Sequence, residues 1–148
     1  FNMLNISNCF GMLDKWKDHA PFILRVVTGV IFAMHGYQKF TGGVGKVAGF
    51  LDSLGFPIAT VFAVILIVAE LLGGIALILG LFTRYAAKIL AIVAVVALFT
   101  VHISKGFFIG QGGYEFILLI LAASISVMIT GPGKWALDNK MSKGEQQQ

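Results

Sequence analysis

Four apolar runs, each close to the length that crosses a lipid bilayer, constrain this chain of 148 residues more than any other feature. They cover about 21–40, 57–82, 85–103 and 114–130. A helix needs roughly 20 apolar residues to span the hydrocarbon core. Charged residues form only 12% of the chain, where a soluble domain carries about 25%. The sequence therefore predicts an all-α fold, an integral membrane four-helix bundle, and excludes a soluble enzyme and a nucleic-acid binder.

The distribution of basic residues predicts the orientation of the bundle. With four spans, both ends of the chain lie on one side, which then carries eight Lys and Arg against three on the other. Because cytoplasmic segments are enriched in Lys and Arg, we expect the N and C termini to be cytoplasmic. The expected organisation is a cytoplasmic or interfacial segment at 1–20, the membrane domain at 21–133 and a polar, unfolded cytoplasmic tail at 134–148.

A single carboxylate, Glu70, interrupts the second apolar run near its centre. A charge at the bilayer midplane costs about 3 kcal/mol on insertion scales, so the side chain must face other helices and be neutralised by a partner or a proton. Arg25 and His35 of the first run lie at neighbouring depths. We therefore expect Glu70 to bond to one of them, with Arg25 and Glu70 forming a buried polar core.

A second polar group is predicted at the outer end of the bundle. Its members come from three spans and lie at similar depth: His35, Lys39, His102, Tyr114 and Glu115. They could form an outward-opening ligand pocket. In the alternative, Lys39 and Glu115 extend to the interface while the histidines satisfy backbone carbonyls. No metal site is predicted, because the chain has one cysteine and no CxxC motif.

Helical periodicity predicts which side of each span faces inward. The candidate helix-packing residues of the second span are Gly73, Gly74 and Gly80, since small residues let helices approach closely in lipid. The inward stripes expected for the other spans are Arg25, Thr28, Phe32, His35, Gly36 and Lys39 in the first, Lys88, Ala91, Val95, Phe99 and His102 in the third, and Glu115, Leu119, Ala122 and Ser126 in the fourth.

Several motifs, taken in order, resemble those of the DoxX family of small four-helix membrane proteins. They are "LRVVTGVIFAMHGYQKF", "LGFP", "AELLGGIALILGLFTR", "GGYEF" and "GPGKWALD". The similarity extends from about Leu24 to Asp138 and includes Arg25 with a G-x-x-K pattern, E-x-x-G-G beginning at Glu70, and His102. The family takes its name from a membrane subunit linked to quinol oxidation and thiosulfate-to-quinone electron transfer.

This resemblance implies a membrane role connected with redox chemistry. The first expectation is an accessory, non-catalytic subunit of a membrane redox or respiratory complex in a prokaryotic plasma membrane. The second is a quinone-binding subunit, and the third is a small-solute or proton carrier. No haem, flavin or iron–sulfur motif is visible, so no intrinsic cofactor is expected and a quinone is the candidate ligand. The expected partners are the lipid bilayer and either other membrane proteins or further copies of the chain.

Overall fold

The computed structural model describes residue 11 and residues 14–145, with side chains to Met141. This part of the chain is helical and contains no strand. Residues 1–10 with Cys9, 12–13 and 146–148, which belong to the predicted terminal segments, lie outside the described residues. The helices are α2 (Ala20–Gly42), α3 (Val44–Ser53), α4 (Ala59–Leu79), α5 (Thr83–Ala97), α6 (Glu115–Thr130) and α7 (Asp138–Glu145), with short turns η1 (Lys17–His19), η2 (Leu98–His102), η3 (Ile103–Lys105) and η4 (Ile109–Gln111).

Three of the described helical segments are long and apolar enough to cross a membrane: Lys17–Gly42, Ala59–Leu79 and Thr83–Lys105. Helix α6 is apolar but has only 16 residues. It begins and ends close to the predicted limits of the fourth span. Three helices thus have the length and composition of membrane-spanning helices. Helix α6 packs beside them.

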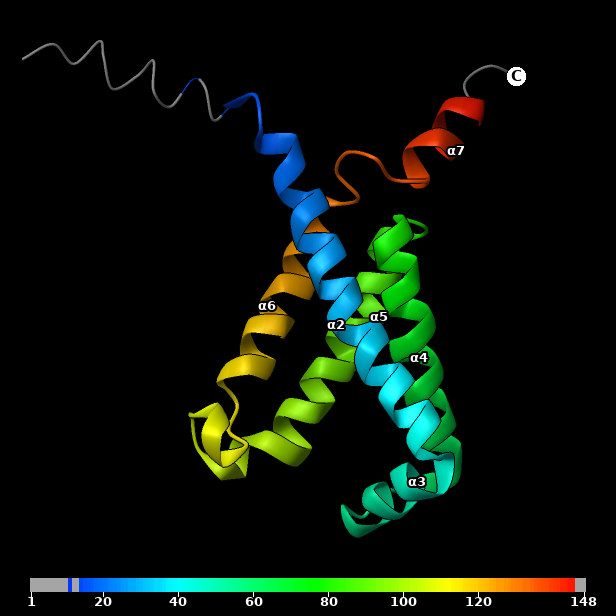
Figure 1. Ribbon diagram of the computed structural model, residues 1–148, viewed down its shortest axis with the longest axis vertical. Helices are drawn as coiled ribbons and strands as arrows, with labels where there is room; N and C mark the ends of the chain where they lie inside the picture. The colour runs from blue at the N-terminus through cyan, green and yellow to red at the C-terminus, as the bar shows by residue number, and fades with distance from the viewer. Residues whose placement is uncertain (1–10, 12–13, 146–148) are drawn as a thin grey trace, which may run out of the picture.

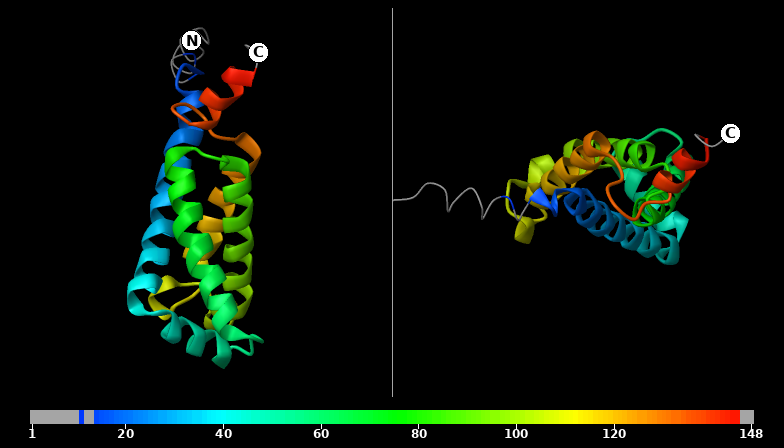
Figure 2. Two further views of the ribbon diagram at one scale, coloured as in Figure 1. Left: turned by 90° about the vertical axis from the view of Figure 1, so that its right-hand side faces the viewer. Right: turned by 90° about the horizontal axis from the view of Figure 1, so that it is seen from above.

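The long helices form two pairs, α2 with α4 and α5 with α6. Figure 1 shows α2 and α6 lying close together near the beginning of α2 and diverging along their length. The beginning of α2 and helix α7 lie at one end of the molecule, and α3 lies at the other (Figure 2). We call the first the closed end, formed by the beginning of α2, the α4–α5 turn and residues 131–138. The remainder, towards α3 and the loop at 106–114, is the open half.

Glycines hold α2 against α4. A side chain at Gly74 would meet the backbone of Ala33 and, at 2.7 Å, the carbonyl oxygen of Gly29, and one at Gly36 would meet the backbone of Leu71. Gly73 instead contacts the flexible side chain of Leu90 on α5. Because small residues let helix backbones approach in lipid, this pair stays in contact into the open half.

The inward sides of α5 and α6 differ from the predicted stripes. Val95 and Phe99 are 39% and 62% exposed, and Leu119 of α6 is 66% exposed, so these predictions are wrong. Ala91 of the predicted α5 stripe is buried, as are Ala87, Leu90 and Ala94, and α6 buries Ile120, Ser124 and Val127. The inward side of α5 and α6 is therefore the side whose side chains allow close helix packing. The positions of polar residues along these helices do not predict it.

The closed end is organised by Arg25, whose side chain is fully buried. Its guanidinium donates hydrogen bonds to five carbonyl oxygens, those of Leu77 and Ile78 at the end of α4 and of Pro132, Lys134 and Trp135 after α6, at distances of 2.6–3.3 Å. Gly80, with φ of 69°, lies directly against this guanidinium. The planar donor fork of arginine suits such multiple bonding. Arg25 therefore does not pair with Glu70, and that prediction is wrong.

Asp138 fastens the chain beyond α6 to the beginning of α5. Its two carboxylate oxygens accept hydrogen bonds from the amides of Phe82 and Thr83 at 2.7 and 2.9 Å. These amides belong to the unpaired donors of a helix N-terminus, where a negative charge is favoured. Arg84 in turn donates to the carbonyls of Met128 and Ile129 at the end of α6. The described part of the predicted unfolded tail therefore begins with residues that are hydrogen-bonded to the closed end and continues as helix α7.

Candidate ligand-binding site in the open half

The carboxylate of Glu70 meets Lys39 of α2, and their Nζ and Oε2 atoms are 2.5 Å apart. Glu70 is buried and Lys39 is partly exposed. The contact of Gly36 with Leu71 brings α2 against α4 at this level, so the long lysine side chain reaches the acid. His35 is not the partner either, because its Nδ1 bonds to the carbonyl of Ile31 in its own helix at 2.8 Å. Lys39 was predicted as a pocket residue, and its role as the ion-pair partner was missed.

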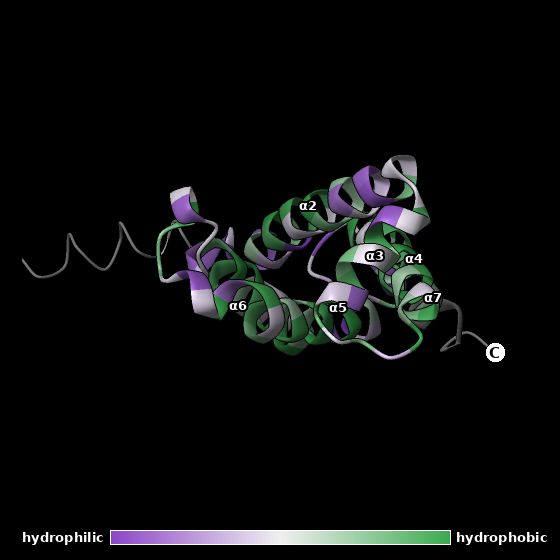
Figure 3. Cartoon of the chain, turned by 90° about the horizontal axis from the view of Figure 1, so that it is seen from below, coloured by the Kyte–Doolittle hydropathy of each residue, from purple (hydrophilic) through white to green (hydrophobic). Residues whose placement is uncertain are grey.

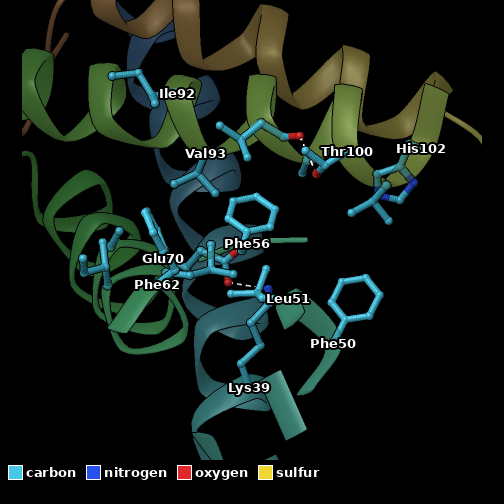
Figure 4. A pocket seen from close by; sticks show the side chains of 16 residues that line it. Lys39, Phe50, Leu51, Phe56, Phe62, Glu70, Ile92, Val93, Thr100 and His102 are labelled. Atoms are coloured by element: carbon cyan, nitrogen blue, oxygen red, sulfur yellow. Dashed lines mark hydrogen bonds and ion pairs between the residues drawn. The ribbon is translucent and has the colours of Figure 1, made fainter. Parts of the chain in front are cut away.

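An apolar cavity of about 360 Å³ begins at this ion pair and lies between α4 and α5. Figure 4 shows Phe56, Phe62 and Val93 around it, with Lys39 and Glu70 at one side and His102 and Thr100 at another. The volume lies within the range of small-molecule sites, about 300–1,000 Å³, which are mostly apolar with a few polar groups. The cavity could therefore hold an apolar molecule with a polar head group.

A second cavity of about 190 Å³ lies on the other side of the same ion pair, between α2, α5 and α6. Its polar lining comes from His35, Lys39, Glu70 and His102, and its apolar lining includes Ile117 of α6. Gly112 and Gly113 border it at the loop before α6. The ion pair and His102 line both cavities, so they stand at the boundary between them.

His102 faces the cavities because α5 ends in a π-helical turn, η2. The extra residue per turn changes the register that regular α-helical spacing predicts, and such turns are frequent at functional sites. The Nδ1 atom of His102 lies 2.8 Å from the carbonyl oxygen of Gly112. A carbonyl only accepts hydrogen bonds, so Nδ1 carries a proton, and Nε2 has no protein partner among the described residues.

Tyr114 and Glu115 line neither of these cavities. Glu115 accepts a hydrogen bond from the amide of Ile109 at 2.6 Å, and the ring of Tyr114 packs edge-on against Phe107 at 5.4 Å between centroids. Both residues fix the loop at 106–114. Of the five predicted pocket residues, the structure brings His35, Lys39 and His102 together with Glu70, and these two lie apart.

Helix α3 contributes a part of the site that the sequence analysis missed. It supplies Phe50 and Leu51 to the larger cavity, and Phe56 follows it. Its buried residues, Ala48 and Leu51, pack against Ala63 of α4. The signal was present in "VGKVAGFLDS", where apolar residues recur at helical spacing. Figure 3 views this end and shows apolar positions dominating α4, α5 and α6.

Comparison with known proteins agrees with this architecture. The sequence profile of the DoxX family matches residues 20–103. A Bacillus subtilis protein named "Putative oxidoreductase CatD" is 36% identical over 133 residues, covering 90% of this chain and 95% of its own. The inner membrane protein YqjF of Escherichia coli is 28% identical over 133 residues, covering 88% and 98% of the two chains. No solved structure matches the chain.

The chain is an α-helical integral membrane protein, as its three long apolar helices and the membrane proteins among its relatives indicate. It belongs to the DoxX family, whose profile covers more than half of its length. The match ends at residue 103, so it includes Arg25, Lys39, Glu70 and His102 but not the loop before α6 or the docked segment at 131–138.

Proposed function

We propose that this protein is a membrane subunit of a redox complex and that it binds a quinone in the cavity between α4 and α5. The observation that carries the proposal is the cavity itself, an apolar space of about 360 Å³ whose lining includes the Lys39–Glu70 pair and His102. A purely accessory subunit would not need such a space. The oxidoreductase name of the Bacillus subtilis relative supports a redox setting.

The residues around the cavity fit a quinone in chemical terms. Aromatic and aliphatic side chains such as Phe62 and Val96 offer an apolar lining for the ring and the isoprenoid tail. The ammonium of Lys39 can donate a hydrogen bond to a quinone carbonyl, and the carboxylate of Glu70 can accept one from a quinol hydroxyl. A bound quinone supplies two-electron chemistry, while these residues orient its head group. Electrons would pass to a cofactor of a partner subunit.

We further propose that α2, α4, α5 and α6 all cross the membrane, with the closed end in the cytoplasm. Helix α6 is about 24 Å long at 1.5 Å per residue. It runs antiparallel to α5, because Arg84 near the beginning of α5 holds the carbonyls at the end of α6. The excess of Lys and Arg at the closed end favours a cytoplasmic location.

Binding can be tested with the protein in lipid nanodiscs and a short-chain ubiquinone, using equilibrium dialysis or calorimetry. Ala69→Phe places a ring inside the cavity, and Leu72→Phe places one on the exposed side of the same helix. We expect saturable binding to the unaltered protein and to Leu72→Phe, and at least about tenfold weaker binding to Ala69→Phe. Absence of saturable binding, or equal affinity in both variants, would contradict the proposal.

Membership of a redox complex is tested separately by purification from native membranes in a mild detergent. We expect a stoichiometric partner that carries a flavin, haem or iron–sulfur cofactor, detected by its absorption spectrum and by mass spectrometry. Recovery of the chain alone, as a monodisperse species without a redox-active partner, would argue against this part of the proposal.

A further inference from the structure

The smaller cavity, between α2, α5 and α6, shares Lys39, Glu70 and His102 with the proposed quinone site and adds His35 to its polar lining. Four ionisable side chains face it, His35 and Lys39 from α2, Glu70 from α4 and His102 from η2, while α6 contributes apolar side chains. Both histidines bond through Nδ1 to backbone carbonyls. Within the described residues, Nε2 of neither ring has a protein partner.

Such a lining favours water over lipid chains as the content of this cavity. An unpaired nitrogen in hydrocarbon costs several kcal/mol, about 2–7 for a polar group without a hydrogen bond. A volume of about 190 Å³ has room for several water molecules, each of which takes about 30 Å³ in the liquid. Water would satisfy the Nε2 atoms of His35 and His102.

This cavity borders the loop at one end and is blocked at the other. Gly112 and Gly113 of the loop at 106–114 lie beside it. Towards the closed end, Leu77, Leu90 and Val127 of three different helices are completely buried and belong to one apolar cluster. A polar route therefore reaches the ion pair from the loop side and stops at this apolar layer.

We infer that the smaller cavity is a water-filled half-pathway that connects the Lys39–Glu70 pair with the aqueous side opposite the closed end. His102 stands between this pathway and the larger cavity. The inference deepens the proposed function, since a quinone head group takes up or releases protons when its redox state changes. Those protons would be exchanged with the side opposite the closed end, and a path through the whole membrane is not formed.

The pathway is tested by cysteine accessibility in a Cys9→Ser background, with a charged thiol reagent that does not cross membranes. Ile117→Cys places the thiol in the smaller cavity. Leu119→Cys lies on the exposed side of the same helix, and Ala94→Cys lies in the packed core. Met141→Cys on α7 marks the side of the closed end. Labelling is measured in right-side-out and in inverted membrane vesicles by mass shift.

We expect Ile117→Cys to react only from the side opposite to that of Met141→Cys, and at least about tenfold faster than Leu119→Cys or Ala94→Cys, because a thiol ionises readily only where water reaches it. Failure of Ile117→Cys to react from either side, or reaction from the side of Met141→Cys, would overturn the inference. The experiment uses no quinone. Its failure is therefore distinguishable from loss of ubiquinone binding, which would contradict the proposed function alone.

Discussion

The closed end and the open half of this molecule use buried charge in opposite ways. At the closed end, Arg25 is fully buried and surrounded by five carbonyl acceptors, and Asp138 accepts two amide hydrogen bonds. In the open half, the Lys39–Glu70 pair lies beside two cavities, with His102 next to it. At the closed end, the charged side chains bond the ends of the helices to one another. In the open half, the charged side chains lie beside cavities that a ligand or water can fill.

This difference predicts where substitutions should affect stability and where they should affect binding. A fully satisfied buried network loses many hydrogen bonds when one member is removed. The Lys39–Glu70 pair has one buried and one partly exposed member, and an ion pair of this kind contributes less to stability. Four variants, in order of expected effect, test this contrast.

The largest effect is expected for Arg25→Met, which leaves five carbonyl oxygens without their donor. Each buried unsatisfied acceptor costs about 1–3 kcal/mol, so the loss should exceed about 3 kcal/mol. Thermal unfolding in detergent, followed by circular dichroism, measures it. Lys88→Met removes an exposed basic residue from the same end and serves as the control. Similar melting temperatures for the two variants would show that the Arg25 network does not hold the closed end.

Gly74→Ala should have the next largest effect. The added methyl group would meet the backbone of α2, which cannot yield as a side chain does, and overpacking costs about 1–3 kcal/mol. Gly49→Ala on α3 adds the same group in open space and should be neutral or slightly stabilising. The two melting temperatures in detergent give the comparison. Equal behaviour would mean that α2 and α4 do not depend on close approach.

Asp138→Ala should destabilise the closed end by about 0.5–2 kcal/mol, the range for loss of a helix N-terminal cap. The amides of Phe82 and Thr83 would lose their acceptor, and hydrogen exchange at the beginning of α5 should accelerate. Exchange measured by mass spectrometry localises the effect. Asp52→Ala, an exposed acid on α3, should leave this segment unchanged. Unchanged exchange in both variants would contradict the capping role.

The smallest stability effect is expected in the open half, for the double variant Lys39→Met with Glu70→Leu. Replacing both members of a buried pair by apolar residues is often neutral or stabilising, so a change within about 1 kcal/mol is expected. Glu70→Gln alone should destabilise more, since Lys39 then lacks its partner. Quinone binding should nevertheless be lost in the double variant. A large loss of stability in the double variant would contradict the proposed difference between the closed end and the open half.

The sequence by itself determined the helical membrane class, the approximate limits of the long helices and the inward direction of Glu70. These follow from hydropathy, from helix-breaking glycine and proline, and from the cost of a charge in hydrocarbon, which are local properties. Glu70 is 6% exposed, as expected of a residue that must avoid lipid.

Only the tertiary structure decided which residues the buried polar side chains contact. Lys39 rather than Arg25 meets Glu70, because the glycine contacts between α2 and α4 set which side chains share a level. His102 was predicted to face inward, but Val95 and Phe99 of the same predicted stripe are exposed, and the π-helical turn changes the helix register before His102. Asp138 binds the segment that composition alone assigned to an unfolded tail to the beginning of α5. Such pairings depend on helix register and on chain segments 31 to 56 residues apart. Periodicity within one helix carries no information about either.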